Sequence, residues 1–209
     1  MESRARAYVG LGSNEGSSRD VLASAVHALA ALPEARIKGV SRLYRTKPVG
    51  PVTQRDFLNA VVGLSVPAGP TPETGAMALL LALKGIERAL GRVERERWGP
   101  REVDLDLLLF GDHAIHVERD AAARSDDPAR SDVQWLDVPH VSARERLFVL
   151  APLADLAADL VPPGWQLTVA AALDEVAAAE AADSVVVAGT WDAEAAGWSV
   201  ALAGRHSRQ

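Results

Sequence analysis

The chain has 209 residues, a formal net charge of −6 and no cysteine. It therefore lacks the thiols for a disulfide scaffold, a cysteine-ligated zinc site or a thiolate nucleophile. Its overall charge gives it no general attraction for nucleic acids or anionic membranes. Hydrophobic residues make up 48% of the sequence, so it can fill a core without structural staples. With no apolar run of membrane-spanning length and no apolar signal segment after Met1, we expect a cytoplasmic protein.

In the first half of the chain, apolar runs alternate with apolar residues at helical spacing. These patterns predict a strand at 8–11, a helix between Ser18 and Pro33, strands at 36–44 and 57–66, and a helix at 72–90. Thr71 is the expected N-cap of the second helix, and Pro72 its first residue. The glycines of residues 10–16 lack the spacing of a nucleotide-binding loop, so we expect a turn there.

The middle of the chain predicts a strand at 103–110. Gly111 and Asp112 would turn that strand toward a short partner at 114–117. The segment from about 118 to 135 is charged, rich in alanine, serine and aspartate, and aperiodic. We expect it to be a flexible surface insertion.

The last third predicts two helices and a hairpin. The capping-box sequence Ser142-x-x-Glu145 indicates the start of a helix, which Pro152 is expected to end. An alanine-rich helix at 168–182 and a hairpin at 184–202 follow. We expect one domain over residues 1–190 and a tail at 191–209, which can form a hairpin on that domain.

The predicted order of elements is strand, helix, two strands, helix and strand. Consecutive strands between two helices argue against a purely parallel, doubly wound sheet. The order predicts an α+β fold: an antiparallel sheet with helices packed on its faces, in the split βαβ pattern.

Two aspartates, Asp104 and Asp106, alternate with leucines along the predicted strand at 103–110. Side chains two apart on a strand share a face, so the two carboxylates lie side by side. Alone, they could be two solvated side chains at a sheet edge. Mg²⁺ also suits such a pair, because it takes one or two carboxylates together with water and substrate phosphates. Cations before the pair favour a phosphate site: Arg92, Arg95, Arg97 and Arg101.

An aromatic ring and an amide, Phe57 and Asn59, lie two residues apart on another predicted strand. An amide beside a ring suits a flat heterocycle with hydrogen-bonding edges, although Phe57 alone would indicate core packing. Further along, His140 is followed by Arg146 and Phe148, which add cations and a second ring. A lone histidine is more often structural than functional, so this group predicts a site only together with the others.

Six short motifs occur in order along the chain. They are Gly12-Ser13-Asn14; Tyr44-Arg45-Thr46 with Pro48-Val49-Gly50; Asp56-Phe57-Leu58-Asn59-Ala60; Ile86-Glu87 with Gly91-Arg92; Arg97-Trp98-Gly99-Pro100-Arg101 with Asp104-Leu105-Asp106; and Pro139-His140 with Arg146 and Phe148. Together they resemble the 6-hydroxymethyl-7,8-dihydropterin pyrophosphokinase family over residues 8–163. The block from Arg97 to Asp106 is highly specific to that family.

The resemblance implies a ferredoxin-like fold and transfer of pyrophosphate from ATP to 6-hydroxymethyl-7,8-dihydropterin, with release of AMP, in folate biosynthesis. It implies two Mg²⁺ ions, both held by Asp104 and Asp106. These aspartates, with Arg92 and Arg101, would form the catalytic group. The residues implied to bind ATP are Arg92, Arg97, Trp98, Arg101, Leu107, His140 and Arg146. Those implied to bind the pterin are Thr46, Pro48, Val49, Phe57, Asn59 and Phe148.

Three other functions remain open from the residues. The same aspartates could serve a different Mg²⁺-dependent phosphoryl or nucleotidyl transferase, and a relative that has lost catalysis would keep the fold. An RNA-binding module is disfavoured, because two aspartates on a strand face would repel a phosphate backbone. We expect a monomer with no nucleic-acid or membrane partner. Val141 and the insertion depart from the family pattern, which leaves the adenine pocket open.

Overall fold

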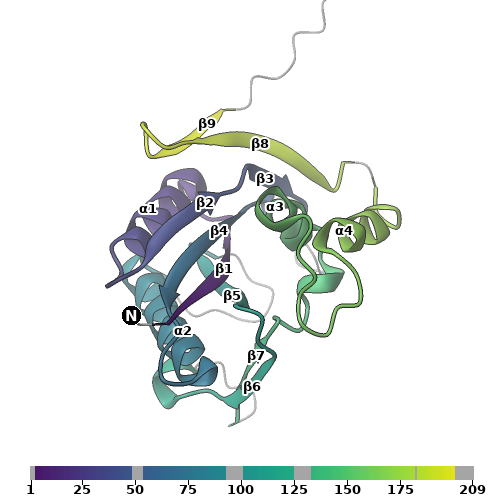
Figure 1. The fold of residues 1–209 in the computed structure, drawn as a ribbon. Helices are drawn as coiled ribbons and strands as arrows, with labels where there is room; N and C mark the ends of the chain where they lie inside the picture. Colours follow the sequence, from purple (N-terminus) through teal and green to yellow (C-terminus); the bar gives the residue numbers. More distant parts are fainter. Residues whose placement is uncertain (1–2, 49–53, 93–100, 125–132, 182, 201–209) are drawn as a thin grey trace, which may run out of the picture.

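The computed structural model describes residues 3–48, 54–92, 101–124, 133–181 and 183–200. A seven-stranded sheet forms its centre, with strand order β5-β1-β4-β3-β8-β9, and β2 pairs with β4 (Figure 1). Its strands are β1 (Arg4–Ser13), β2 (Arg36–Val40), β3 (Leu43–Thr46), β4 (Phe57–Pro67), β5 (Asp104–Phe110), β8 (Val185–Asp192) and β9 (Gly197–Val200). Neighbouring strands are antiparallel, which confirms the predicted antiparallel sheet.

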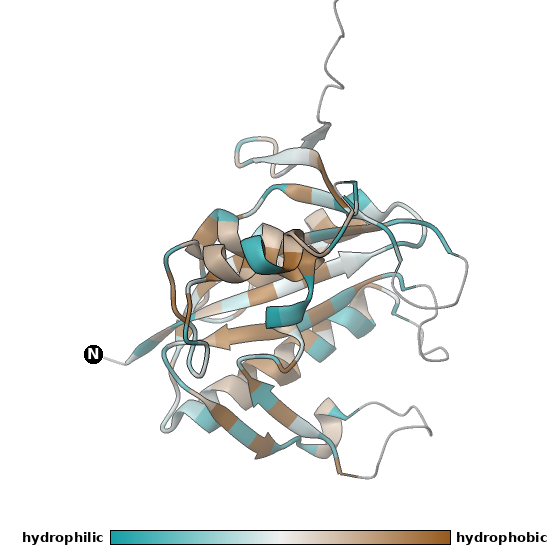
Figure 2. Ribbon diagram, turned by 90° about the vertical axis from the view of Figure 1, so that its right-hand side faces the viewer, coloured by the Kyte–Doolittle hydropathy of each residue, from teal (hydrophilic) through white to brown (hydrophobic). Residues whose placement is uncertain are grey.

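Helices α1 (Ser18–Ala30) and α2 (Pro72–Ala89) cover one face of the sheet. Their buried leucines pack against strand residues such as Val9, Val62 and Leu105 in the main core. The start of α2 is as predicted: Thr71 is the N-cap and its hydroxyl accepts a hydrogen bond from the backbone N–H of Thr74. The alternation of hydrophobic and hydrophilic stretches along the ribbon is visible in Figure 2.

Helices α3 (Leu147–Ala157) and α4 (Val169–Ala177) lie on the opposite face. They bury a smaller cluster with Tyr8, Val61 and Leu108 of the sheet. The hydroxyl of Tyr44 on β3 donates to the carboxylate of Asp155 on α3 at 3.0 Å. Since α3 and α4 cover only part of this face, the rest of it is available for a site.

A second, two-stranded sheet consists of β6 (Ile115–Glu118) and β7 (Trp135–Val138). The predicted pairing of 114–117 with 103–110 is therefore wrong, because β6 takes β7 as its partner. Within the segment expected to be a flexible surface insertion, a 3₁₀ turn at Ala121–Ala123 buries Ala123, and β7 begins at Trp135. Residues 125–132 of that stretch lie outside the described residues.

Three local predictions are corrected. Gly12 and Ser13 belong to β1 rather than to a turn, because both pair with β4 and Gly12 also pairs with β5. The helix expected from Ser142 begins instead at Leu147, after a 3₁₀ turn at Ala143–Glu145. Pro152 lies inside α3, where it is buried beside Leu153, so packing outweighs the backbone bond that proline cannot donate.

The C-terminal hairpin of β8 and β9 is part of the main sheet and extends it beyond β3. The predicted boundary between residues 190 and 191 falls inside β8. Over the residues that the structure describes, no helix combines the length and the apolar character needed to cross a membrane.

Candidate active site

The two aspartates of β5 face a row of glycines on β1. In the antiparallel register, Asp106 lies opposite Gly10 and Asp104 opposite Gly12, while Gly12 also lies opposite Asn59 of β4. Opposite residues share a face of the sheet. Asp104, Gly12 and Asn59 therefore form one row across three strands, roughly 10 Å from end to end at the usual strand spacing. Glycine in the middle leaves that space without a side chain.

The β4 end of the row holds the predicted amide and ring. Asn59 is buried, and its Nδ2 donates to the Thr46 Oγ1 at 2.7 Å. Phe57 lies two residues before Asn59, half-buried at the start of β4 and paired with Thr46. The structure thus brings together Thr46, Phe57 and Asn59, as the sequence predicted. Pro48 follows in the same connection, half-buried.

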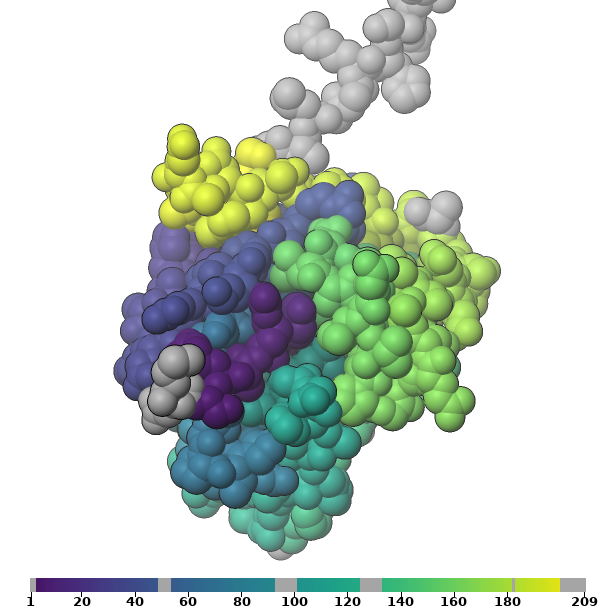
Figure 3. All heavy atoms as spheres, in the orientation of Figure 1, coloured from purple at the N-terminus to yellow at the C-terminus, as the bar shows by residue number. Residues whose placement is uncertain are grey.

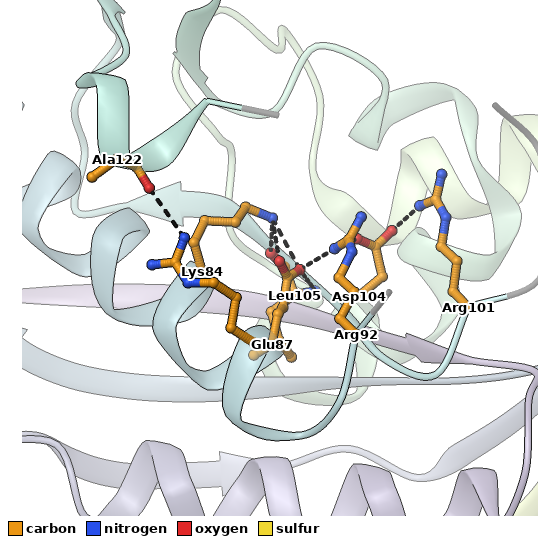
Figure 4. A network of polar contacts seen from close by, with 8 residues as sticks. Lys84, Glu87, Arg92, Arg101, Asp104, Leu105 and Ala122 are labelled. Atoms are coloured by element: carbon orange, nitrogen blue, oxygen red, sulfur yellow. Dashed lines mark hydrogen bonds and ion pairs between the residues drawn. The ribbon is translucent and has the colours of Figure 1, made fainter. Parts of the chain in front are cut away.

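At the other end of the row, Asp104 lies between two guanidinium groups, as Figure 4 shows. Arg92 Nη1 lies 2.5 Å from the Asp104 Oδ1, and Arg101 Nη1 contacts Oδ2. Burial by itself raises the pKa of Asp104, but the charges of Arg101, Arg92 and Lys84 outweigh it and hold the pKa well below its usual range. The ionised form of Asp104 is therefore favoured, and the two arginines are already aimed at negative charge.

A buried carboxylate that received no role in the sequence analysis, Glu87 on α2, organises this cluster. Its side chain is 3% exposed and accepts from the Lys84 Nζ at 2.9 Å, from Arg92, and from the Leu105 backbone N–H at 2.7 Å. All these partners are donors, so they bind the ionised form, although burial raises the pKa of Glu87. Glu87 thus fixes Arg92 relative to β5 (Figure 4).

The sequence held a signal for Glu87. It lies four residues after Leu83 and next to Ile86, within the apolar stripe of α2. An acidic residue on the buried side of a helix requires a partner charge, because burying an isolated charge is very costly.

Asn14 joins three segments beside the cluster. This buried amide accepts from the Arg101 backbone N–H at 2.8 Å and donates to the Gln54 Oε1 at 2.9 Å and to the Arg55 carbonyl at 3.2 Å. It therefore fixes the described end of the connection that precedes β5, and with it the backbone of Arg101. Asn14 was part of a motif but was assigned no role, since a polar residue after a strand most often indicates a turn.

A cavity of about 110 Å³ lies beside Asp106. Its lining comes from α2, β5 and the small sheet, and consists of Leu80, Lys84, Asp106, Leu107, Arg119, Trp135, Leu136, Asp137, His140 and Val141. The predicted residues Leu107 and His140 therefore line the same cavity as Asp106. Trp135 and Asp137 were missed, because their strand was not predicted and Trp135 lay at the end of the expected insertion.

The remaining predicted residues are placed as follows. Arg146 and Phe148 stand together at the start of α3, where the Arg146 guanidinium lies 5.6 Å from the Phe148 ring centre. Phe148 is half-buried. Val49, Arg97 and Trp98 lie outside the described residues.

Asp104 and Asp106 are the residues that could hold a divalent cation. Each carboxylate oxygen has two lone pairs, so Asp104 can accept from its arginines and still offer oxygen to a cation. In the described part of the chain, the Asp106 carboxylate has no hydrogen-bond or ion-pair partner, and no group of three or more histidine, cysteine or acidic side chains suits a metal. A cation here would take its other ligands from water and phosphate oxygens, which is the usual arrangement for Mg²⁺.

The chain is similar to several known proteins. A model of the 7,8-dihydro-6-hydroxymethylpterin-pyrophosphokinase (HPPK) family matches residues 8–158. The 2-amino-4-hydroxy-6-hydroxymethyldihydropteridine pyrophosphokinase of Pseudomonas aeruginosa is 42% identical over 163 residues, which cover 78% of this chain and 87% of that protein. The protein of the same name from Methylorubrum extorquens is 42% identical over 159 residues, covering 76% and 87%.

The fold is also similar to a solved structure. The crystal structure of wild-type HPPK-DHPS from Plasmodium falciparum superimposes with a TM-score of 0.64 at 15% identity, covering 85% of this chain. This chain spans 46% of the length of that protein, so the likeness concerns the fold of one part of it.

Proposed function

Because the chain belongs to the 7,8-dihydro-6-hydroxymethylpterin-pyrophosphokinase family, we propose that it transfers the pyrophosphoryl group of ATP to 6-hydroxymethyl-7,8-dihydropterin. The hydroxymethyl oxygen attacks the β-phosphorus of ATP and loses its proton. The bond from that phosphorus to the oxygen bridging the α-phosphorus breaks, and AMP leaves. The reaction is a step of folate biosynthesis.

One observation carries this proposal: the row of Asp104, Gly12 and Asn59 on a single face of the sheet. In this row Asp104, which we propose lies at the phosphate site, and Asn59, which we propose binds the heterocycle, are about two strand spacings apart, with no side chain between them. A pterin at the Asn59 end would direct its hydroxymethyl group along the row. A triphosphate held at the Asp104 end would then present its β-phosphorus to that hydroxyl, and such positioning can supply much of the rate.

In this proposal, Arg92 and Arg101 bind phosphate oxygens. Both already contact the anionic Asp104, and guanidinium groups recognise phosphate in the same planar geometry as carboxylate. The arginines offset the negative charge that moves onto the leaving AMP. Glu87 keeps Arg92 in place without contacting substrate.

Asp104 and Asp106 would hold Mg²⁺, two ions in our proposal. Bound there with the triphosphate, Mg²⁺ would neutralise phosphate charge and orient the β-phosphorus. The charges of Arg101, Arg92 and Lys84 hold the pKa of Asp104 well below its usual range, which favours the ionised carboxylate that a cation needs. We assign no general base, so the proposed rate comes from positioning and electrostatics.

The nucleoside of ATP would extend from Asp106 into the neighbouring cavity. Trp135 and Leu107 supply apolar surface there, while Lys84, Arg119 and His140 supply donors. The pterin would lie near Asn59 with the rings of Phe57 and Phe148 on its two sides, and Thr46 and Pro48 would border it. Val49, Arg97 and Trp98, proposed to contribute to the pterin and ATP sites, lie outside the described residues.

The finer assignment of the fold as ferredoxin-like belongs to the same proposal. Its support is the element order β1-α1-β2/β3-β4-α2-β5 together with the neighbour order β5-β1-β4-β3. A split βαβ unit has this arrangement.

An assay of AMP formation tests the function. The protein is incubated with ATP, Mg²⁺ and 6-hydroxymethyl-7,8-dihydropterin, and the adenine nucleotides are separated. We expect AMP and the pterin diphosphate in equal amounts, and no AMP when the pterin is left out. Formation of ADP instead would indicate transfer of a single phosphoryl group, and would contradict the proposal.

Gly12 provides a test of the row itself. A Cβ at position 12 would lie 3.1 Å from the Asn59 Oδ1, tighter than an ordinary contact. We therefore expect Gly12→Ala to raise the dissociation constant of the pterin roughly tenfold, measured by calorimetry, because the amide must shift. In Gly10→Ala, the matched control on the same strand and face, the new methyl would meet Leu108 at an ordinary 3.4 Å. Equal pterin affinity in the two variants would show that Asn59 does not bind the pterin.

A further inference from the structure

The hairpin of β8 and β9 lies beyond residue 158, where the family match ends. It is nevertheless part of the main sheet, because β8 pairs with β3 along all four residues of that strand. On its other side β3 borders β4. The hairpin thus converts β3 from an edge strand, which is free to move on one side, into an interior strand.

The far side of the hairpin is anchored in the core. Trp198 is 5% exposed, and its Nε1 donates to the Ser41 carbonyl at 2.9 Å. The rings of Trp191 and Trp198 meet edge to face at 4.7 Å. The Arg19 guanidinium of α1 donates to the carbonyls of Ala188 at 3.3 Å and Trp198 at 3.4 Å. Figure 3 shows the yellow hairpin residues lying against the purple and blue N-terminal part of the chain.

The beginning of β8 reaches the heterocycle end of the site. Val185 pairs with Thr46, and the backbone N–H of Lys47 donates to the Ser184 carbonyl at 3.4 Å. The Lys47 Nζ lies 2.6 Å from the Asp183 Oδ2. The Thr46 Oγ1 in turn accepts a hydrogen bond from the Asn59 Nδ2 at 2.7 Å. A continuous set of contacts therefore runs from the hairpin through Thr46 to Asn59.

We propose that the C-terminal hairpin is a positioning element for the pterin half of the site. It fixes the backbone of Thr46 and Lys47, and through the Thr46 hydroxyl it orients the Asn59 amide. This inference rests on the proposed function. The Asp104 cluster lies on β5, separated from β3 by β1 and β4. The hairpin therefore determines pterin affinity and leaves ATP affinity unchanged.

Gly189 allows the hairpin to be disturbed in the full chain. A Cβ at this position would lie 2.2 Å from the Ser199 carbonyl oxygen of β9, so Gly189→Ala must displace the two strands. At Gly197, in the same hairpin, a Cβ would have its nearest neighbour at 3.8 Å, which makes Gly197→Ala the matched control. We expect Gly189→Ala to weaken pterin binding roughly tenfold while the affinity for a non-hydrolysable ATP analogue stays within about twofold. Gly197→Ala should change neither.

A second pair of variants covers the case in which Gly189→Ala does not fold. Asp183 is exposed, so Asp183→Lys places a like charge beside Lys47 without touching the core. Glu194→Lys makes the same change of net charge at the exposed turn of the hairpin. The pterin dissociation constant should rise in Asp183→Lys and not in Glu194→Lys, and hydrogen exchange at the amides of Thr46 and Lys47 should quicken in Asp183→Lys alone.

Three results would overturn the proposal: equal weakening of both ligands in Gly189→Ala, unchanged pterin affinity despite faster exchange at Thr46, or equal effects in the two charge variants. Failure of the proposed function would be recognised separately. In that case the unaltered chain itself would not bind the pterin or release AMP, whatever the state of the hairpin.

Discussion

Asp106→Asn is expected to lower kcat by at least about a hundredfold, the usual cost of removing one preorganised charge that stabilises a transition state. The change keeps the shape of the side chain and removes the negative charge that would hold Mg²⁺ next to the triphosphate. Stability should change little, because among the described residues the Asp106 carboxylate has no hydrogen-bond or ion-pair partner, and its neutralisation removes both its repulsion with Asp104 and its attraction to Arg92. Initial rates at saturating Mg²⁺ and thermal unfolding measure the two effects.

Asp112→Asn is the control for this prediction. Asp112 follows the same strand, but its side chain is 96% exposed in the turn after β5. It should therefore retain normal kcat and normal stability. Normal kcat in Asp106→Asn would show that Asp106 holds no catalytic metal. A loss that more Mg²⁺ restores would instead locate the defect in metal affinity.

Glu87→Ala should lower the free energy of unfolding more than any other substitution proposed for this chain. The variant leaves Lys84 and Arg92 partly buried without the carboxylate that both contact, and leaves the Leu105 backbone N–H without its acceptor. Removing one partner of a buried ion pair costs about 3–5 kcal/mol of the free energy of unfolding. For a chain of this size, each kcal/mol lowers the melting temperature by about 2–4 °C. Urea titration of the purified variant measures the change directly.

The matched substitution is Glu194→Ala, at an exposed position in the hairpin turn. Surface changes of this kind usually stay within about 0.5 kcal/mol. A loss in Glu87→Ala no larger than that of Glu194→Ala would mean that solvent screens the Glu87 cluster. The buried network would then not be what fixes Arg92.

Local signals predicted most of the core. Thr71 with Pro72 located the start of α2, and the alternation of Asp104 and Asp106 with leucines located β5 and the face of its carboxylates. The errors arose where partners distant in sequence decide the structure. Strand β6 could not be assigned to β7, because that pairing spans the aperiodic stretch between them. Pro152 was expected to end a helix, but burial against the sheet outweighed the local preference.

Individual residues of the candidate site could be predicted from the sequence, but their arrangement in space could not. Single motifs pointed to Asp104, Arg101 and Asn59, and the structure places them around Gly12. What the motifs could not supply was the role of Glu87 and Asn14. Both act through hydrogen bonds to residues brought near by the fold, and such bonds leave only a weak trace in local sequence.

The central position of β1 has a consequence for the protein during its synthesis. This strand is made before β5, yet its pairing with β5 extends as far as Phe110. Ribosomes add about 5–20 residues per second, so β1 waits roughly 5–20 s for that neighbour. Meanwhile one edge of a hydrophobic strand has no partner, and unpaired edges invite association with other chains. Asp104 and Asp106 lie on the strand that covers this edge, so the edge stays open until these two aspartates have emerged.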